Sequence, residues 1–514
     1  MLVFLADLHL TDGTVRDSLA VDAVDWLARQ LSAAAEEASY RRDGSYRPID
    51  RLDLVLLGDV LDFLATDRWT ARSSVRPWLP PDSPGLFAQL SRIAEAILRH
   101  NEPIVDFFAQ LRRQGVGVPP LLRTRSPNDA ECDYVPVIVH YVVGERDWFL
   151  HLPGAAYDRL REMVGSAFGV AQPFEAPFPH EMIEDAILLD ALRRHKVAAR
   201  HGDAFDPFCY AGDRDSASIF DVFVVELLVR FQASLQRELG DFLDESLTAR
   251  IRRIHHVYPA VAAPAWLDGI LQAACLPPRL QRAIESVWDS CCDEFLRHER
   301  VAAWLDEGDR GTRRRLMRLL RFSSRPARDW WKKLIAWHRR LRGAESDSFV
   351  VHALAEQDFR NRRAKHIVYA HRRENEIVPL EASFADGYVL DQVFYQTAGW
   401  ATVESSARLA RAHAEPVAFD VRQLPVFFQG DEASGRPFVV STAVLGRRRG
   451  MVRREPAVAK RTMQSADRQG SAAVHGAEAV PQPHFSTAAE RRETSPDADS
   501  SVERPASQTN EATE

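Results

Sequence analysis

The chain has 514 residues, a formal net charge of −7 and a sequence pI of about 6.2, and 46% of its residues are hydrophobic. A chain of this length can form two domains, or one domain with a large insertion, around a sizeable core. The weakly acidic balance gives no global argument for nucleic-acid binding, although basic residues are concentrated in one segment.

Cysteine usage favours a reduced compartment, and the hydropathy pattern predicts no membrane-spanning helix. An odd number of cysteines without a Cys-x-x-Cys pair is not typical of a disulfide framework. No apolar run reaches the roughly 18 residues of a membrane-spanning helix, and a strand is expected from Leu2, which leaves no basic signal-peptide region. We therefore predict a cytoplasmic protein, with peripheral attachment to the inner face of the membrane as a further option. The five cysteines are Cys132, Cys209, Cys275, Cys291 and Cys292.

Apolar strands alternate with helices over the first 210 residues. Continuous apolar runs such as "LDLVLLGDV" are typical of strands buried on both faces. Strands that alternate with helices predict an α/β core. The expected strands lie at 2–6, 52–60, 135–147 and 196–200, and the expected helices at 15–39 and at 86–114, the latter broken near Pro103.

The second half begins with a helical segment and returns to strands. Amphipathic spacing predicts helices at 217–239, 246–256, 278–297, 299–306 and 311–342, the last interrupted near Pro326. Strand character returns in "AKHIVYAHRR", "EIVPL", "GYVLDQVFYQ" and a hairpin within "PVFFQGDEASGRPFVV". From about residue 447 the composition predicts a disordered tail. The predicted organisation is a core of 1–210 and 346–446, a helical cap of 211–345, and a tail of 447–514.

Residue types that bind metals follow each of the buried strands. In an α/β sheet the ends of such strands face one crevice, and carboxylates and imidazoles are common ligands of divalent metals. The alternative is that these residues only cap strands and begin turns. The residues are Asp7 and His9, then Asp59 and Asp62, then Glu145, Arg146 and Asp147, then His201 and Asp203, and finally His371.

The order of these motifs resembles that of the calcineurin-like metallophosphoesterases. The family patterns D-x-H, G-D-x-x-D, G-N-H-D, H-G and G-H-x-H correspond here to "DLH", "GDVLD", "GERD", "HG" and "AHRR". "EIVPL" followed by "YQTAGW" is similar to the end of the family pattern. The resemblance covers roughly 1–205 and 360–445. It implies a four-layer α/β sandwich in which two mixed sheets are flanked by helices, with the cap inserted between the last two motifs.

The resemblance also implies a dinuclear metal site and a reaction. The metals would be manganese first, with iron, zinc or magnesium as alternatives. Water activated between them would hydrolyse a phosphoester or phosphoanhydride of a phosphorylated substrate. Asp62 and Asp147 would orient neighbouring groups. The implied metal ligands are Asp7 and His9 for the first ion, Asp59 as the bridge, and Glu145, His201 and His371 for the second ion; the implied catalytic residues are Arg146, Asp147 and Arg373.

Three positions depart from the family pattern. Glu145 replaces Asn, Arg373 replaces the last His, and Arg146 replaces a His, as in a subfamily similar to UDP-2,3-diacylglucosamine pyrophosphatase. The first two changes add one negative and one positive charge, so the charge of the site is unchanged. In one interpretation Glu145 stays a ligand and Arg373 binds substrate phosphate. In the other the two side chains pair, which leaves a catalytically impaired protein that binds a phosphorylated ligand or partner.

The segment 310–342 is strongly basic. It holds thirteen Lys or Arg residues and one acid, Asp329, together with Trp330, Trp331 and Trp337. It could form cap helices with solvated basic faces, lie on an anionic membrane surface, or contact nucleic acid. The membrane surface is favoured over nucleic acid as a partner, because the subfamily resemblance suggests a lipid-linked phosphate.

Overall fold

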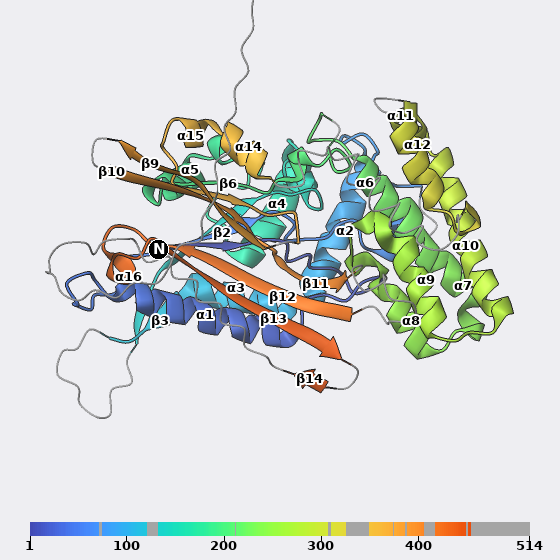
Figure 1. Cartoon of the computed structure of the whole chain (residues 1–514), viewed down its shortest axis with the longest axis horizontal. Helices are drawn as coiled ribbons and strands as arrows, with labels where there is room; N and C mark the ends of the chain where they lie inside the picture. The colour runs from blue at the N-terminus through green and yellow to red at the C-terminus, as the bar shows by residue number, and fades with distance from the viewer. Residues whose placement is uncertain are drawn as a thin grey trace, which may run out of the picture. The chain divides into compact units, whose positions relative to one another are not determined.

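The computed structural model describes residues 1–70, 74–120, 132–210, 212–306, 310–324, 349–373, 375–385, 388–405, 417–448 and 451–453. These residues all fall within one compact unit, Met1–Thr462 (Figure 1). Most of the predicted tail, 447–514, lies outside the described residues. Its first residues differ from the prediction, because strand β13 reaches Arg448 and a short strand β14 follows at Met451–Arg453.

The larger sheet is mixed and carries the N-terminus at its centre. Strands β1, β2 and β5 run parallel, and β12 is antiparallel to both β1 and β13. The other end of β12 pairs with β11 (Trp400–Ser405), which also pairs with the two-residue strand β7 (Val257–Tyr258). The main spatial order is β14, β13 (Phe438–Arg448), β12 (Val417–Phe427), β1 (Leu2–Leu5), β2 (Leu52–Leu57) and β5 (Val137–Val142).

The second sheet has four described strands and is also mixed. Strands β6, β8 and β10 are parallel, and β9 forms an antiparallel hairpin with β10. A separate two-stranded ribbon joins β3 (Val116–Val118) to β4 (Asp133–Val135). The spatial order of the second sheet is β6 (Val197–Arg200), β8 (His366–Tyr369), β10 (Tyr388–Gln396) and β9 (Glu376–Ala385).

The two sheets face each other across an apolar core. Phe4 of β1 and Val55 of β2 belong to the same buried cluster as Val368 of β8 and Tyr395 of β10. Alternate residues such as Leu5 point the other way, toward a core shared with helices, because successive side chains of a strand leave opposite faces. The prediction of an α/β protein with two mixed sheets flanked by helices is confirmed.

Helices cover the outer faces of both sheets (Figure 1). The expected break near Pro103 is confirmed: α2 ends at His100 and Pro103 lies in the first turn of α3, where a missing N–H costs nothing. The helix expected from residue 15 begins only at Val21, and in the loop before it the Arg16 side chain donates to the buried Asp62 at 3.1 Å. The helices are α1 (Val21–Ser39), α2 (Pro84–His100), α3 (Glu102–Gln114), α4 (Ala155–Phe168) and α5 (Ala186–Arg194), with α14 (Val350–Ala355) and α15 (Gln357–Arg360) on the second sheet and the short α16 (Glu432–Gly435) in the β12–β13 connection.

The described residues between 212 and 324 are mostly helical, as the sequence predicts. A π-helix, Phe223–Val229, interrupts the first long helix, and all seven of its residues are buried. Strand β7 is a departure from the prediction, and it joins this segment to the large sheet. The helices are α6 (Ile219–Val222), α7 (Arg230–Leu239), α8 (Glu245–Arg252), α9 (Ala263–Ala273), α10 (Pro278–Arg297), α11 (Glu299–Asp306) and α12 (Arg310–Leu319).

Only the first part of the basic segment is described. Arg313 lies 4.4 Å above the Trp304 ring, and Arg314 and Arg321 form ion pairs with acids of the neighbouring helices. These partners satisfy part of the positive charge within the cap itself. The three tryptophans of the segment lie outside the described residues, and the membrane interaction stays a prediction. Among the helices that the structure describes, none is long and apolar enough to cross a bilayer.

A buried histidine between the sheets predicts acid sensitivity. His366 packs against Phe427 and Phe438, and burial followed by the charge of Lys365 lowers its pKa to about 3. The unfolded chain binds a proton there below about pH 6.5 and the folded chain does not. The stabilising term is therefore complete above pH 6.5 and is lost as the pH falls toward 3, at up to about 1.4 kcal/mol per pH unit. The unfolding midpoints of wild type and His366→Asn should therefore converge as the pH is lowered from 7 to 4. Midpoints that fall in parallel would show that His366 is not the source of the acid sensitivity.

Candidate metal centre

The ends of the parallel strands bring the predicted residues together. The backbone N–H groups of Asp7 and His9 donate to the carbonyls of Gly58 and Asp59, at 3.1 and 2.8 Å, so the loops after β1 and β2 stay in register. In the second sheet the Ala370 N–H donates to the His201 carbonyl at 3.0 Å. Parallel strands end at the same edge of their sheet, and the facing sheets place these two edges beside one cavity.

Four of the predicted metal ligands have left-handed backbone conformations. Asp7, His9, Asp59 and His371 have φ angles of 53°, 45°, 53° and 67°. Such angles disfavour residues with a Cβ atom and cost on the order of 1 kcal/mol or more each. Strain of this kind accumulates where surrounding structure holds a side chain in place for binding or catalysis. Of these four residues, His9 and His371 line the cavity, and Asp7 and Asp59 lie within ligand distance of His9.

Asp7, His9 and Asp59 form the first cluster. Their candidate ligand atoms lie within 4.8 Å of one another, and His9 Nε2 is 3.8 Å from Asp7 Oδ1 while His9 Nδ1 is 3.6 Å from Asp59 Oδ2. Asp7 Oδ2, His9 Nδ1 and Asp59 Oδ2 are all buried without a hydrogen-bond partner. Buried polar atoms normally have partners. Two carboxylate oxygens and an imidazole nitrogen without partners fit a divalent cation.

Glu145, His201 and His371 form the second cluster. Glu145 Oε2 accepts hydrogen bonds from His201 Nε2 at 2.7 Å and from His371 Nδ1 at 3.0 Å. His201 Nδ1 donates to the Leu57 carbonyl at 3.0 Å, which directs Nε2 toward Glu145. A backbone contact of this type is usual for histidines that bind metals. The other ring nitrogen of His371 lies 3.4 Å from Asp206 Oδ2.

Asp59 lies between the two clusters. Its Oδ2 belongs to the first cluster, and its Oδ1 lies 3.7 Å from His201 Nε2 of the second. The Arg146 backbone N–H donates to the same Oδ1 at 2.8 Å and holds the carboxylate in this orientation. The position of Asp59 therefore suits a carboxylate shared by two cations.

Burial dominates the electrostatics of the clusters. It raises the pKa of Asp7 to about 6, and burial followed by the nearby Glu145 charge raises the pKa of Asp59 well above its usual value. Burial and then the Arg16 charge keep the pKa of His9 low, so its imidazole is in the neutral form that binds metals. A cation would remove the cost of ionising both carboxylates.

The second cluster carries its own charge balance. Burial disfavours every charge in it, but His371 and His201 outweigh burial and hold the pKa of Glu145 well below its usual value. In the same way, Asp59 and Glu145 raise the pKa of His201, and Glu145 with Asp206 raises that of His371 to about 9. Without a cation the cluster is thus held by protonated imidazoles around one carboxylate. A metal would have to displace those protons.

Two guanidinium groups face the same cavity, which has a volume of about 50 Å³ and is also lined by His9, Glu145 and His371. Arg146 donates to both carboxylate oxygens of Asp62 at 3.3 Å, and its guanidinium lies 4.4 Å from the Phe220 ring centroid. Arg373 donates through Nη1 to the carbonyls of His256 and Thr402, at 3.3 and 3.5 Å. The cavity therefore combines candidate metal ligands with fixed positive charge.

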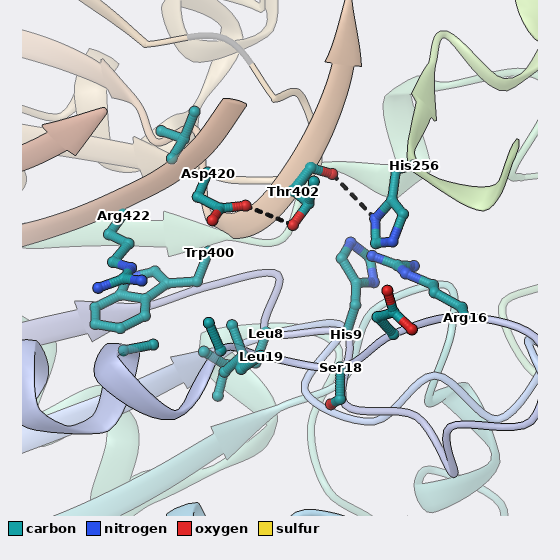
Figure 2. Close-up of a pocket in the computed structure, with 14 residues that line it drawn as sticks. Leu8, His9, Arg16, Ser18, Leu19, His256, Trp400, Thr402, Asp420 and Arg422 are labelled. Carbon is teal, nitrogen blue, oxygen red and sulfur yellow. Dashed lines mark hydrogen bonds between the residues drawn. The ribbon is translucent and has the colours of Figure 1, made fainter. Parts of the chain in front are cut away.

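Glu145 and Arg373 have separate partners. Glu145 bonds the two histidines, Arg373 bonds backbone carbonyls, and no ion pair joins them among the described residues. A second pocket adjoins the first and shares His9 (Figure 2). Figure 2 shows His9, Arg16 and His256 close together there, with the Thr402 carbonyl bound by His256. The pairing of Glu145 with Arg373 is therefore not observed, and binding of substrate phosphate by Arg373 stays a prediction.

Asp147 supports the site from behind and does not line the cavity. Its carboxylate accepts hydrogen bonds from the N–H groups of Gly144 and Val60 and from the Tyr141 hydroxyl, at 2.7, 2.8 and 2.7 Å. It therefore joins the loops that carry Glu145 and Asp59. The structure places Asp147 as a positioning residue.

Sequence reasoning missed several residues of the site. Asp206, which follows His201 by five positions, contacts His371, whereas Asp203 pairs with Arg214 instead. The signal for Asp206 was present in "RHGDAFDP", but spacing alone does not choose between the two aspartates. The other missed residues that line the two pockets include Arg16, Cys209, His255 and His256.

Comparisons of the chain with protein-family models, with curated proteins and with solved structures found no match.

Gly144 lies beside both clusters, so we predict that a methyl group added at this position disturbs them. A Cβ atom at this position would lie 2.8 Å from the His201 ring and closer still to the Asp59 carboxylate. We expect Gly144→Ala to weaken metal binding by about 10–100-fold, as changes next to metal ligands do. Gly117→Ala is the control, because its Cβ would make only ordinary contacts. Calorimetric titration of each variant with the metal measures the two affinities. Equal affinities for Gly144→Ala and Gly117→Ala would show that Gly144 does not position the ligands.

Proposed function

We propose that the protein is a metal-dependent hydrolase of a phosphoester or phosphoanhydride, of the calcineurin-like metallophosphoesterase type. The observation that carries the proposal is the pair of buried ligand clusters that meet at Asp59 beside the guanidinium groups of Arg146 and Arg373. The two facing mixed sheets support the four-layer architecture that this family type implies.

The donor set suits two divalent cations. Asp7, His9 and Asp59 would hold one, and Asp59 with the second cluster, Glu145, His201 and His371, would hold the other. Mixed oxygen and nitrogen donors suit manganese, iron or zinc, and the carboxylate-rich first cluster favours manganese. Such ions supply an activated water and neutralise charge on phosphoryl oxygens.

The chain's own cations would bind the substrate. Arg146 and Arg373 carry fixed charges that can donate charge-assisted hydrogen bonds to phosphoryl oxygens. Neither can act as a general acid, because a guanidinium stays protonated at ordinary pH. Asp62 positions Arg146, with a second ion pair from Arg16 at 3.1 Å. Leu228 and Val261 from the cap, and Phe208 just before it, also line the cavity and would limit access of water.

A second candidate function is binding without catalysis. Its support is the second cluster, where Glu145 satisfies both histidines without a cation. A protein held in this state would retain the guanidinium groups of Arg146 and Arg373 as a binding site for a phosphorylated ligand or partner. Metal content separates the two functions.

Asp59→Asn tests the hydrolase. Asparagine keeps the shape of the side chain but loses the charge that both cations need, so we expect metal content and Mn²⁺-dependent hydrolysis of bis(p-nitrophenyl) phosphate to fall. The fall should exceed the roughly 10–100-fold typical of residues outside the first coordination sphere. Asp53→Asn is the matched control, since Asp53 lies in β2, the strand that Asp59 follows, but pairs with His140 and does not line the cavity.

Metal content by mass spectrometry and initial rates are measured on wild type and both variants. If the wild-type protein holds no metal and Asp59→Asn does not change its activity, the hydrolase proposal is excluded and the binding function remains.

The double variant Glu145→Asn/Arg373→His tests the altered motifs. Removing the Arg373 charge near Asp7 and His9 favours a cation in the first cluster. We expect tighter Mn²⁺ binding and faster hydrolysis of the generic diester, with loss of affinity for inorganic phosphate as the cationic side chain disappears. Isothermal titration of Mn²⁺ and of phosphate checks both. Unchanged phosphate affinity would argue against Arg373 as a substrate-binding group.

A further inference from the structure

A separate group of metal-binding residue types lies outside the main cavity. His151 follows the 3₁₀ turn Trp148–Leu150, His180 precedes the turn Met182–Glu184, and Asp215 lies shortly before α6. We propose that His151, His180 and Asp215 form a further site for a divalent cation of the zinc type, which joins the start of the cap to the core. This site is independent of the proposed hydrolase function.

The separations of the three side chains suit one small cation. Asp215 Oδ1 lies 3.5 Å from His180 Nε2 and 3.8 Å from His151 Nε2, and the three ligand atoms lie within 4.8 Å of one another. Tetrahedral zinc with bonds of about 2.0–2.1 Å places its ligand atoms roughly 3.3–3.5 Å apart. Each imidazole therefore needs to approach the Asp215 oxygen by at most a few tenths of an ångström, and a fourth position stays open.

His180 gives an independent sign of a ligand. Its side chain is 4% exposed, Nδ1 has no hydrogen-bond partner, and Nε2 has only the long 3.5 Å contact with Asp215 Oδ1, which does not meet hydrogen-bond geometry. Asp215 Oδ1 is also buried without such a partner. A buried imidazole normally satisfies at least one nitrogen, because leaving both unpaired costs about 1–3 kcal/mol. Both orphaned groups point into the same cluster, and a cation there would satisfy them together.

His151 is already oriented as a ligand. Its Nδ1 lies 2.8 Å from the Phe178 carbonyl, which can only accept, so Nδ1 carries the proton. Nε2 is then the nitrogen with a free electron pair, and it faces Asp215. Metal-binding histidines usually show this arrangement, in which a backbone carbonyl fixes the ring and its tautomer.

The surrounding charges permit a cation. Arg214 is a fixed positive charge that acts on His180 and Asp215, and it is paired with Asp203 at 2.8 Å and Glu181 at 2.8 Å. The Asp215 side chain is 42% exposed and that of His151 is 21% exposed, so an ion can enter from solvent. Two imidazoles and one carboxylate favour zinc, cobalt or nickel over magnesium or calcium, which prefer oxygen ligands.

The position of the site suggests its effect. Asp206 and Phe208, a few residues before Asp215, line the main cavity, and the cap helices begin a few residues after it. A cation shared by Asp215 and the two core histidines would restrain the segment that leads into the cap. The expected consequence is greater stability rather than a direct part in hydrolysis.

Zinc and cobalt binding to the full chain test the site. Wild type, His180→Gln, Asp215→Asn and the control His195→Gln are loaded with Zn²⁺ or Co²⁺, each also in an Asp59→Asn background that weakens the main site. His195 is a buried histidine whose Nδ1 already bonds a backbone carbonyl. We expect His180→Gln and Asp215→Asn to lose one equivalent of zinc, the visible absorption of tetrahedral cobalt, and the rise in thermal midpoint on adding zinc.

Asp215 is partly exposed, so Asp215→Asn keeps the test valid if His180→Gln does not fold. Equal zinc content and equal cobalt spectra in wild type and Asp215→Asn would overturn the proposal. Loss of zinc in Asp59→Asn alone reports on the main cavity, so the failure of one site is distinguishable from the failure of the other.

Discussion

Burial of negative charge at the ends of the central strands is the constraint on which the rest of the structure depends. Asp7 and Asp59 are almost completely buried, and each has a carboxylate oxygen without a hydrogen-bond partner. A buried carboxylate is tolerated only when it is protonated, paired or bound to a cation. Placing two of them beside Glu145 demands positive charge nearby, and the chain supplies it as imidazoles and guanidinium groups from distant segments.

The facing sheets and the cap create this environment jointly. The larger sheet contributes the first cluster and Glu145, and the second sheet contributes His201 and His371. The inter-sheet core, in which Phe4 packs near Tyr395, fixes the distance between the two contributions. Residues of the cap, such as Phe220 against Arg146, close the cavity and reduce the local dielectric response. Low dielectric strengthens every charge interaction inside the cavity, favourable or not.

The altered positions Glu145 and Arg373 are compatible with this charge balance. Their charges cancel in the sum, yet each side chain has its own partners, so they do not neutralise each other directly. Glu145 makes the second cluster self-sufficient without a cation, whereas Arg373 adds positive charge near the first. The two clusters are therefore expected to differ in cation affinity, and this difference is where the hydrolase and binding functions diverge.

The sequence by itself determined the type of most elements and many of the residues around the cavity. Long apolar runs predicted β1, β2 and β5, and amphipathic spacing predicted α10 and α11 with the observed bounds. These signals are local, because periodicity and apolar content reflect which faces are buried. Strand-end polar residues such as Asp7, Asp59 and His371 were recognisable for the same reason.

Only the tertiary structure decided which of these side chains meet. The contact of Asp206 rather than Asp203 with His371 and the separation of Glu145 from Arg373 depend on segments far apart in the chain. The short strand β7 and the cluster of His151, His180 and Asp215 likewise have no local signal. Packing of the two sheets and the cap sets these contacts, and spacing along one sequence carries no record of that packing.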